Sequence, residues 1–128
     1  MMHGDMSEQA VRNTIEQYFS SLNAKDPQGV SVACHFPHFR VMGNNTVYQW
    51  QTADVLFAWF QDHVSDDGWD YSELNELTLE RFNDEKYHAS LTFSRYQADG
   101  TLIGNYKSLY IVIFKDDRWG ITGGSGSG

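Results

Sequence analysis

Residues 91–121 read LTFSRYQADGTLIGNYKSLYIVIFKDDRWGI, and this stretch decides the fold. Apolar and polar side chains alternate along it, which is typical of strands with one buried face. Asp99-Gly100 and Asp116-Asp117 interrupt the alternation with residues that favour turns. Connections this short force neighbouring strands to run antiparallel. The sequence therefore predicts strands over about 86–97, 102–114 and 118–122, preceded by a strand over about 72–82.

Counting outward from the two turns predicts the register of this meander. The first turn pairs Tyr96 with Ile103, Arg95 with Gly104, Phe93 with Tyr106, Leu91 with Ser108, Ala89 with Tyr110 and Tyr87 with Val112. The second pairs Phe114 with Trp119, Val112 with Ile121 and Tyr110 with Gly123. One face of the sheet then collects most of the large rings and should pack on helices.

The opposite face of the predicted sheet mixes small hydroxyl side chains with aliphatic ones. In water it would expose several large apolar side chains together, which is unusual for a monomer. We expect this face to form a homodimer with a second copy of the chain; the residues expected there are Ser90, Thr92, Ile103, Leu109 and Ile111.

Helix signals dominate the first half of the chain. Apolar residues from Val11 to Leu22 recur at helical spacing, Asp26-Pro27 starts a second helix that ends near Cys34, and Thr52 caps a third over about 53–64. Two short strands, about 39–42 and 46–50, separate the last two helices. The fold class is therefore α+β, with three N-terminal helices packed on a strongly curved antiparallel sheet.

The 128 residues suit a single domain. We expect residues 1–6 to be disordered and GGSGSG, residues 123–128, to be a flexible tail or an appended linker. A formal net charge of −8, without a run of Lys or Arg, argues against nucleic acid and anionic membranes as partners. A single cysteine, Cys34, and no recognisable signal peptide predict a cytoplasmic location.

Four segments carry a resemblance to a known family: FSSLNAKDPQGV (19–30), HFPHFRVMGNN (35–45), WDYSEL (69–74) and residues 91–121. Over about residues 7–122 the chain resembles the nuclear transport factor 2-like superfamily, and more narrowly its SnoaL-like members. The resemblance implies a cystatin-like cone with an internal pocket and a homodimer through the outer sheet face. Similar proteins often carry an arginine and an aromatic residue in the last strand, where this sequence has Gly124 and Ser127.

Polar tips among the inward rings suggest a binding site for a small, largely apolar molecule with a carbonyl or carboxylate. The residues expected to bind it are Trp59, Tyr71, Phe93, Arg95, Tyr106, Ser108 and Tyr110. Asp70, at the start of the sheet, and His38 are candidate catalytic bases. The spacing of His35 and His38 across Pro37 does not suit a metal site, and no cofactor motif is present.

Three functions remain open at this stage. The first is binding of a small molecule without a reaction. The second is a cofactor-free proton-transfer enzyme, such as an isomerase, cyclase or dehydratase, with Asp70 or His38 as base and Tyr106 or Tyr110 as donor. The third is a dimeric interaction module whose cavity has no chemistry.

Overall fold

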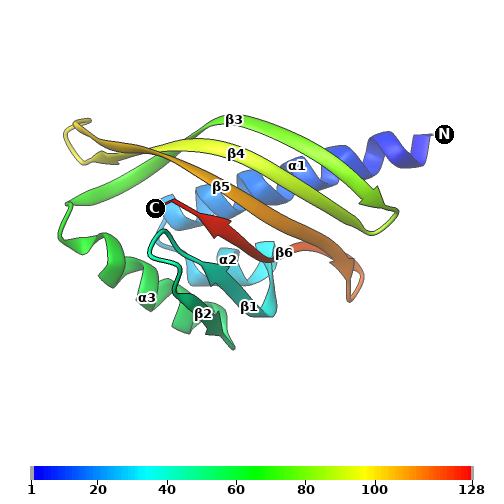
Figure 1. The fold of residues 1–128 in the computed structure, drawn as a ribbon, viewed down its shortest axis with the longest axis horizontal. Coiled ribbons are helices and arrows are strands. Elements are labelled where there is room, and N and C mark those ends of the chain that lie inside the picture. Colours follow the sequence, from blue (N-terminus) through cyan, green and yellow to red (C-terminus); the bar gives the residue numbers. More distant parts are fainter. Residues whose placement is uncertain (1, 128) are drawn as a thin grey trace.

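The computed structural model describes residues 2–127, which form three helices and six strands (Figure 1). The helices are α1 (Met2–Asn23), α2 (Pro27–Ala33) and α3 (Ala53–Ser65), and the strands are β1 (Cys34–Val41), β2 (Val47–Trp50), β3 (Trp69–Asn83), β4 (Lys86–Gln97), β5 (Leu102–Lys115) and β6 (Arg118–Gly126). This confirms the α+β class and the order of elements.

The helices form where their apolar spacing and caps predict. Val11, Ile15, Tyr18, Phe19 and Leu22 of α1 are each at most 6% exposed, so the predicted stripe faces the core. Thr52 caps α3, because its hydroxyl oxygen accepts a hydrogen bond from the Val55 N–H at 3.3 Å. Asp26 occupies the N-cap position of α2, but its side chain makes no capping bond there.

Both predicted flexible ends differ in the structure. Residues 2–6 continue helix α1 rather than forming a disordered terminus, while residue 1 lies outside the described residues. Gly123–Gly126 continue strand β6, and the Ser127 N–H donates to the Lys107 carbonyl at 2.9 Å. Composition alone misreads this segment, because pairing with β1 and β5 satisfies its backbone and orders it.

The six strands form one sheet in the order β2-β1-β6-β5-β4-β3. All neighbours are antiparallel except β1 and β6, so the sheet is mixed rather than purely antiparallel. Strand β1 begins at Cys34, before the predicted start at Phe39, and passes through Pro37. The β1–β6 register shifts between Cys34 and Phe39, and such an irregularity tolerates a proline without an N–H.

The predicted register of the meander is confirmed over most of its length. The pairs from Tyr87–Val112 to Arg95–Gly104 are as counted, and so are Phe114–Trp119 and Val112–Ile121. Two bulges change the ends: Tyr96 pairs with Leu102 instead of Ile103, and Tyr110 pairs with Gly124 instead of Gly123. Each bulge adds one residue to one strand, which counting from a turn does not reveal.

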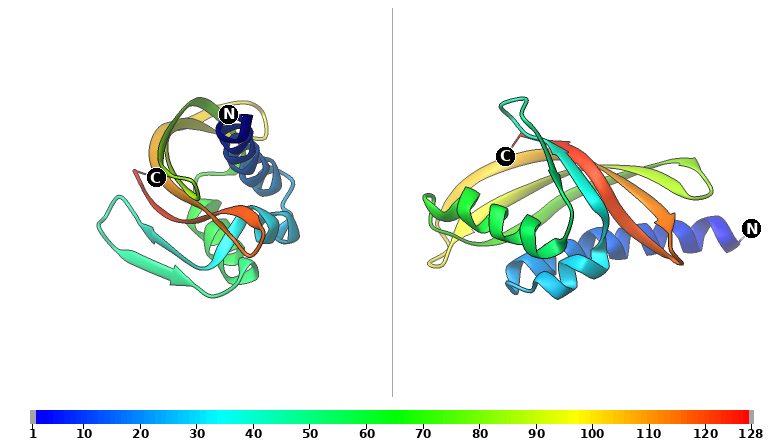
Figure 2. Two further views of the ribbon diagram at one scale, coloured as in Figure 1. Left: turned by 90° about the vertical axis from the view of Figure 1, so that its right-hand side faces the viewer. Right: turned by 90° about the horizontal axis from the view of Figure 1, so that it is seen from below.

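The sheet curls around the helices, so its concave face and the helices enclose the core (Figures 1 and 2). Helix α1 packs on β3 and β6, and α3 packs on α2 and β2. Inward rings from both layers meet in the core: Phe19 lies 5.4 Å from Phe93 and Tyr18 lies 5.8 Å from Tyr110, measured between ring centroids. The helices and the sheet therefore meet through aromatic side chains, as the predicted register requires.

Candidate functional site

A cavity of about 40 Å³ lies between the helices and the concave face of the sheet. One water needs about 10–15 Å³ by this kind of measure, so the space admits a few waters or one compact ligand. Its lining combines aromatic and aliphatic side chains with two arginines; the residues are Tyr18, Phe19, Leu22, Arg40, Met42, Trp50, Leu56, Trp59, Phe60, Ser72, Phe93, Arg95, Ser108, Tyr110 and Gly126.

Arg95 on strand β4 is the more buried of the two arginines, at 7% exposure. Its guanidinium carbon lies 4.5 Å from the ring centroid of Tyr106 and 5.5 Å from that of Phe93. Contacts at these distances are cation–π interactions, and their attraction partly compensates the loss of water around the charge. The Nε–H of Arg95, however, is buried without a hydrogen-bond partner in residues 2–127. A donor left in this state costs about 1–3 kcal/mol, and more when it belongs to a charged group.

Arg40 on strand β1 is held by hydrogen bonds. Its Nε donates to His38 Nε2 at 2.9 Å, and its Nη2 donates to the Tyr18 hydroxyl at 3.2 Å. Its guanidinium carbon lies 4.5 Å from the ring centroid of Tyr110. Arg40 therefore has a fixed orientation at the cavity wall and keeps part of its surface open.

His38 stands behind Arg40 and is 0% exposed. Its Nδ1 bonds to the Ile121 carbonyl at 3.0 Å, so the ring proton sits on Nδ1 and Nε2 is free to accept from Arg40. Burial, followed by the charge of Arg40, lowers the pKa of His38 to about 3. The neutral ring thus positions Arg40, and His38 is not among the lining residues of the cavity.

Gly124 allows Arg40 to reach the cavity. Arg40 pairs with Gly124 across β1 and β6, and Gly124 pairs with Tyr110 across β6 and β5. A Cβ atom at Gly124 would stand 2.9 Å from the Tyr110 ring and 2.3 Å from the Leu109 carbonyl oxygen. Because glycine places no side chain between them, the Arg40 guanidinium can lie on the Tyr110 ring.

Among the residues that the structure describes, neither cavity arginine has an acidic partner. Within residues 2–127, the ion pairs join Arg12 to Glu8, Lys25 to Asp70 and Arg81 to Asp84, all outside the cavity. The described lining residues include no Asp or Glu. The described part of the cavity wall therefore carries two positive charges that the protein does not neutralise, and such an environment favours an anion.

The structure brings most of the predicted binding residues together. Trp59, Phe93, Arg95, Ser108 and Tyr110 line the cavity. Tyr106 lies behind Arg95 as its ring partner and is not part of the lining. Tyr71 stacks on Tyr96 with ring centroids 5.0 Å apart and also stands outside the lining.

The two candidate bases take positions outside the cavity. The Asp70 side chain is 50% exposed and lies 3.7 Å from Lys25 Nζ, at the outer end of β3. Lys25 also donates to the Asp70 backbone carbonyl. His38, the second candidate base, is fully buried, and its Nε2 accepts a hydrogen bond from Arg40. The neighbouring His35 is 3% exposed and bonds through Nε2 to the Arg118 carbonyl at 3.1 Å.

Arg40 is the functional residue that sequence reasoning missed. His38 and Arg40 are two apart on one strand, so their side chains share a face. That spacing is the available signal, because the sequence already indicates His38 as a candidate base. However, the contact of Arg40 with Tyr110 on β5 depends on the β6 bulge, which places Gly124 opposite Tyr110.

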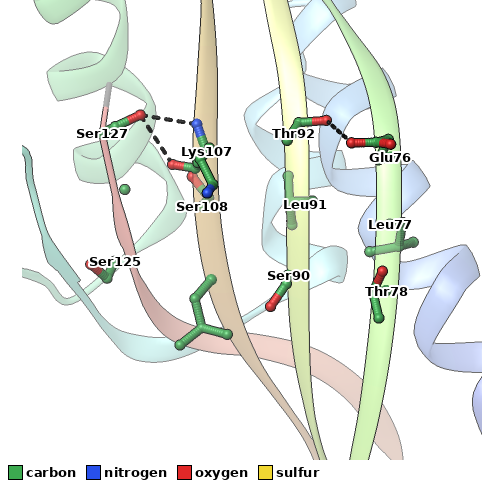
Figure 3. A pocket seen from close by; sticks show the side chains of 12 residues that line it. Glu76, Leu77, Thr78, Ser90, Leu91, Thr92, Lys107, Ser108, Ser125 and Ser127 are labelled. Carbon is green, nitrogen blue, oxygen red and sulfur yellow. Dashed lines mark hydrogen bonds between the residues drawn. The ribbon is translucent and has the colours of Figure 1, made fainter.

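A second, open groove lies on the outer face of the sheet, away from the helices, and has a volume of about 880 Å³ (Figure 3). Short hydroxyl side chains stand along it, among them Thr78, Ser90, Thr92 and Ser125. On the same strands, Asn75 donates to the Ser94 hydroxyl at 2.8 Å, and that hydroxyl donates to Asn105 at 2.6 Å. The groove also contains Leu77, Leu91 and Leu109, and its two charged residues, Glu76 and Lys107, have opposite signs.

A cone of three helices on a curled sheet, with a cavity inside, defines a class of proteins with NTF2-like or cystatin-like folds. The chain belongs to the family described as NTF2-like protein (DUF6841), whose model matches residues 7–127. The match confirms the superfamily, whereas the SnoaL-like branch stays a prediction. The comparison with curated proteins found no significant match.

Solved structures share the fold at low sequence identity. An NTF2-like protein of unknown function from Shewanella oneidensis MR-1 is 12% identical, with a TM-score of 0.74 over 95% of this chain and 99% of that one. A protein of unknown function with a cystatin-like fold from Nostoc punctiforme PCC 73102 is 8% identical, with a TM-score of 0.77 over 95% and 90%. An NTF2-like protein from Cytophaga hutchinsonii ATCC 33406 is 12% identical, with a TM-score of 0.72 over 94% and 96%. These likenesses establish the fold.

Two features are absent from residues 2–127. No helix there has both the length and the apolar character needed to cross a membrane. No group of three or more His, Cys, Asp or Glu side chains in this part of the chain is arranged to hold a metal ion.

Proposed function

We propose that this protein binds a small, largely apolar molecule with a carboxylate in the cone cavity, and that Arg95 pairs with the carboxylate. The observation that carries this proposal is the Arg95 guanidinium, which is 7% exposed, has no acidic partner among the described residues and holds an unpaired Nε–H. A carbonyl group on the ligand would satisfy only the hydrogen bond of the Arg95 Nε–H, whereas a carboxylate would also neutralise the charge of the guanidinium.

The remainder of the lining supports an apolar body for the ligand. The cavity is lined by Phe60 and Trp59 from α3, by Phe93 from β4, and by Phe19 and Leu22 from α1. Such walls favour hydrocarbon or an aromatic ring through burial of apolar area. A polar group at one end and an apolar body at the other would fix the orientation of the ligand.

We propose binding rather than proton transfer. None of the lining residues carries a carboxylate or an imidazole that could accept a proton from a ligand. The lone pair of His38 Nε2 is already engaged by Arg40, and Asp70 pairs with Lys25.

Titration calorimetry with matched acids and amides tests the proposal. The probes are butyrate, hexanoate, benzoate and phenylacetate, each compared with its primary amide. The wild-type protein should bind at least one acid and bind its amide at least about 10-fold more weakly, because a charge-assisted bond is worth about 1.5–3 kcal/mol.

Two variants complete the test. Arg95→Gln should abolish the preference for the acid over the amide. Arg12→Gln changes the net charge equally at a surface position whose side chain is 36% exposed, and it should keep the preference. Equal binding of acid and amide by the wild type, or an acid preference that survives in Arg95→Gln, would refute the assignment.

We also propose that the outer groove is the interface of a homodimer. Leu109 is 36% exposed there, beside the small hydroxyl side chains of Ser90 and Thr92. Ile103 and Ile111 lie on the same strand and are partly exposed. Small side chains let two sheets approach closely, and a second copy would cover the aliphatic ones.

A further inference from the structure

The two arginines mark two ends of one cavity wall. On strand β5, the side chains of Tyr106, Ser108 and Tyr110 alternate with outward ones and so share the inner face. Arg95 lies on the ring of Tyr106, and Arg40 lies on the ring of Tyr110, each at 4.5 Å from guanidinium carbon to ring centroid. Ser108, which lies between the two tyrosines, also lines the cavity.

Both guanidiniums have hydrogen-bonding capacity left. An arginine has five N–H donors. Arg40 uses two directions, toward His38 and Tyr18, and its remaining donors are available at the partly exposed side of the cavity. Arg95 makes no hydrogen bond to any group in residues 2–127 through its buried Nε. One anionic group would neutralise only one of these charges.

We propose that the ligand is a dianion with a negative group at each end, a dicarboxylate by class, bound by Arg95 at one end and by Arg40 at the other. This inference rests on the proposed function and adds the second charge. Tyr106 and Tyr110 are about 13 Å apart along β5 at about 3.3 Å per residue. The small volume of the cavity favours a short diacid, and the best chain length measures the separation of the two guanidiniums. The Ser108 hydroxyl and the aromatic walls would face its middle.

The geometry disfavours two other anions. A single phosphate is too short to reach both guanidiniums if they are separated as their tyrosine partners are. Two separate monocarboxylates would also neutralise both charges, but at the entropic cost of ordering a second molecule. A dicarboxylate neutralises both arginines and orders only one molecule.

The test compares diacids with their half-esters by calorimetry. The probes are succinate, glutarate, adipate and pimelate, each against its monomethyl ester, which keeps the length and removes one charge. For the best chain length, the wild type should bind the diacid roughly 10- to 100-fold more tightly than the half-ester, as expected for one additional charge-assisted pair.

Variants assign the two ends. Arg40→Gln should weaken diacid binding to the level of the half-ester, so that the preference of the wild type for the diacid is lost. Arg95→Gln should weaken both, and Arg12→Gln should change neither. Thermal unfolding checks that each variant folds, and the diacid-to-half-ester ratio of the wild type decides the matter even if Arg40→Gln does not fold.

The outcomes separate the two proposals. If half-esters and diacids bind equally well through Arg95, the ligand is a monoanion and only the dianion inference fails. If inorganic phosphate binds more tightly than every diacid, the inference is also wrong. If neither half-ester nor diacid binds in a manner that depends on Arg95, the proposed function fails together with it.

Discussion

The two faces of the same strands are built for different neighbours. Facing the helices, β4 presents Leu91, Phe93 and Arg95, all at most 7% exposed. Facing outward, the same strand presents Ser90 and Thr92 to an open groove. The inner face holds positive charges that the described residues do not neutralise, whereas the outer face holds hydroxyls and partly exposed aliphatic side chains.

This difference indicates what each face lacks. Buried charge without a counter-charge is unfavourable, so the inner face favours a small anion. Exposed aliphatic groups among short polar ones are unfavourable in water but suit another sheet, so the outer face favours a protein partner. Four predictions test this division between the faces.

Neighbouring substitutions on β4 should differ most in stability. Phe93→Ala removes a ring that is 5% exposed and packs on Phe19 at 5.4 Å, and it should lower the free energy of unfolding by about 3–5 kcal/mol. Thr92→Ala, one residue away on the outer face, should lower it by less than about 1 kcal/mol. Urea denaturation measures both. Similar losses would mean that the strand does not separate a core face from a solvent face.

The buried imidazole of His38 should make the protein less stable in acid. Burial and Arg40 lower its folded-state pKa to about 3, against an ordinary value of 6.5. Between pH 6.5 and about pH 3, the His38 side chain binds a proton in the unfolded chain but stays neutral in the folded chain. This contribution to stability is therefore complete above pH 6.5 and is lost as the pH falls toward 3, by about 1.4 kcal/mol per pH unit.

Denaturation at pH 4 to 7 of the wild type and His38→Gln isolates this effect. Glutamine can still accept from Arg40 and donate to Ile121, but it does not titrate. The slope of the free energy of unfolding against pH should be smaller in His38→Gln by most of the expected value of about 1.4 kcal/mol per pH unit. Identical slopes would show that His38 is not held neutral behind Arg40.

Two adjacent glycines of β6 should respond differently to a methyl group. A Cβ at Gly124 would stand 2.3 Å from the Leu109 carbonyl oxygen, which is backbone and cannot move aside. Gly124→Ala should therefore cost about 1–3 kcal/mol. By displacing Arg40 it should also weaken binding of the diacid. A Cβ at Gly123 would meet the ring of Phe39, which is 36% exposed and can swing away, so Gly123→Ala should cost less. Thermal unfolding and calorimetry compare the two variants. A larger loss in Gly123→Ala than in Gly124→Ala would contradict the position of the Arg40 side chain beside Gly124.

Substitution on the outer face should change association with little effect on the folded chain. Leu109→Asp places a charge in the proposed interface and should convert a dimer to a monomer in sedimentation equilibrium, while unfolding of the monomer changes by about 0.5 kcal/mol or less. Val55→Asp, on α3 and 52% exposed, is the matched control and should leave the dimer intact. A wild-type protein that sediments as a monomer would remove the outer-face interface.

Sequence patterns were sufficient for the meander and its inner face. Two turns and a period of two placed Phe93, Arg95 and Tyr110 on the concave side, because short connections leave little freedom in register. They could not place what depends on distant pairing. The parallel contact of β1 with β6 orders the glycine-rich segment, and the bulge near Thr122 decides that Gly124 faces Tyr110.

The site shows the same limit. Single residues such as Trp59, Arg95 and Ser108 were predictable from face and chemistry. Arg40 was not, because its place depends on a hydrogen bond to a buried histidine and on the lack of a side chain at Gly124. The outward position of Asp70 follows from its pairing with Lys25, a residue 45 positions earlier in the chain.

The most direct measurement is a crystal structure with the tightest-binding carboxylate from the calorimetric series. The account predicts density for that acid inside the cone, with a carboxylate oxygen about 2.7–2.9 Å from Arg95 Nε and its hydrocarbon part against Phe60 and Phe93. An acid bound elsewhere, or one inside the cone with its carboxylate turned away from Arg95, would contradict it.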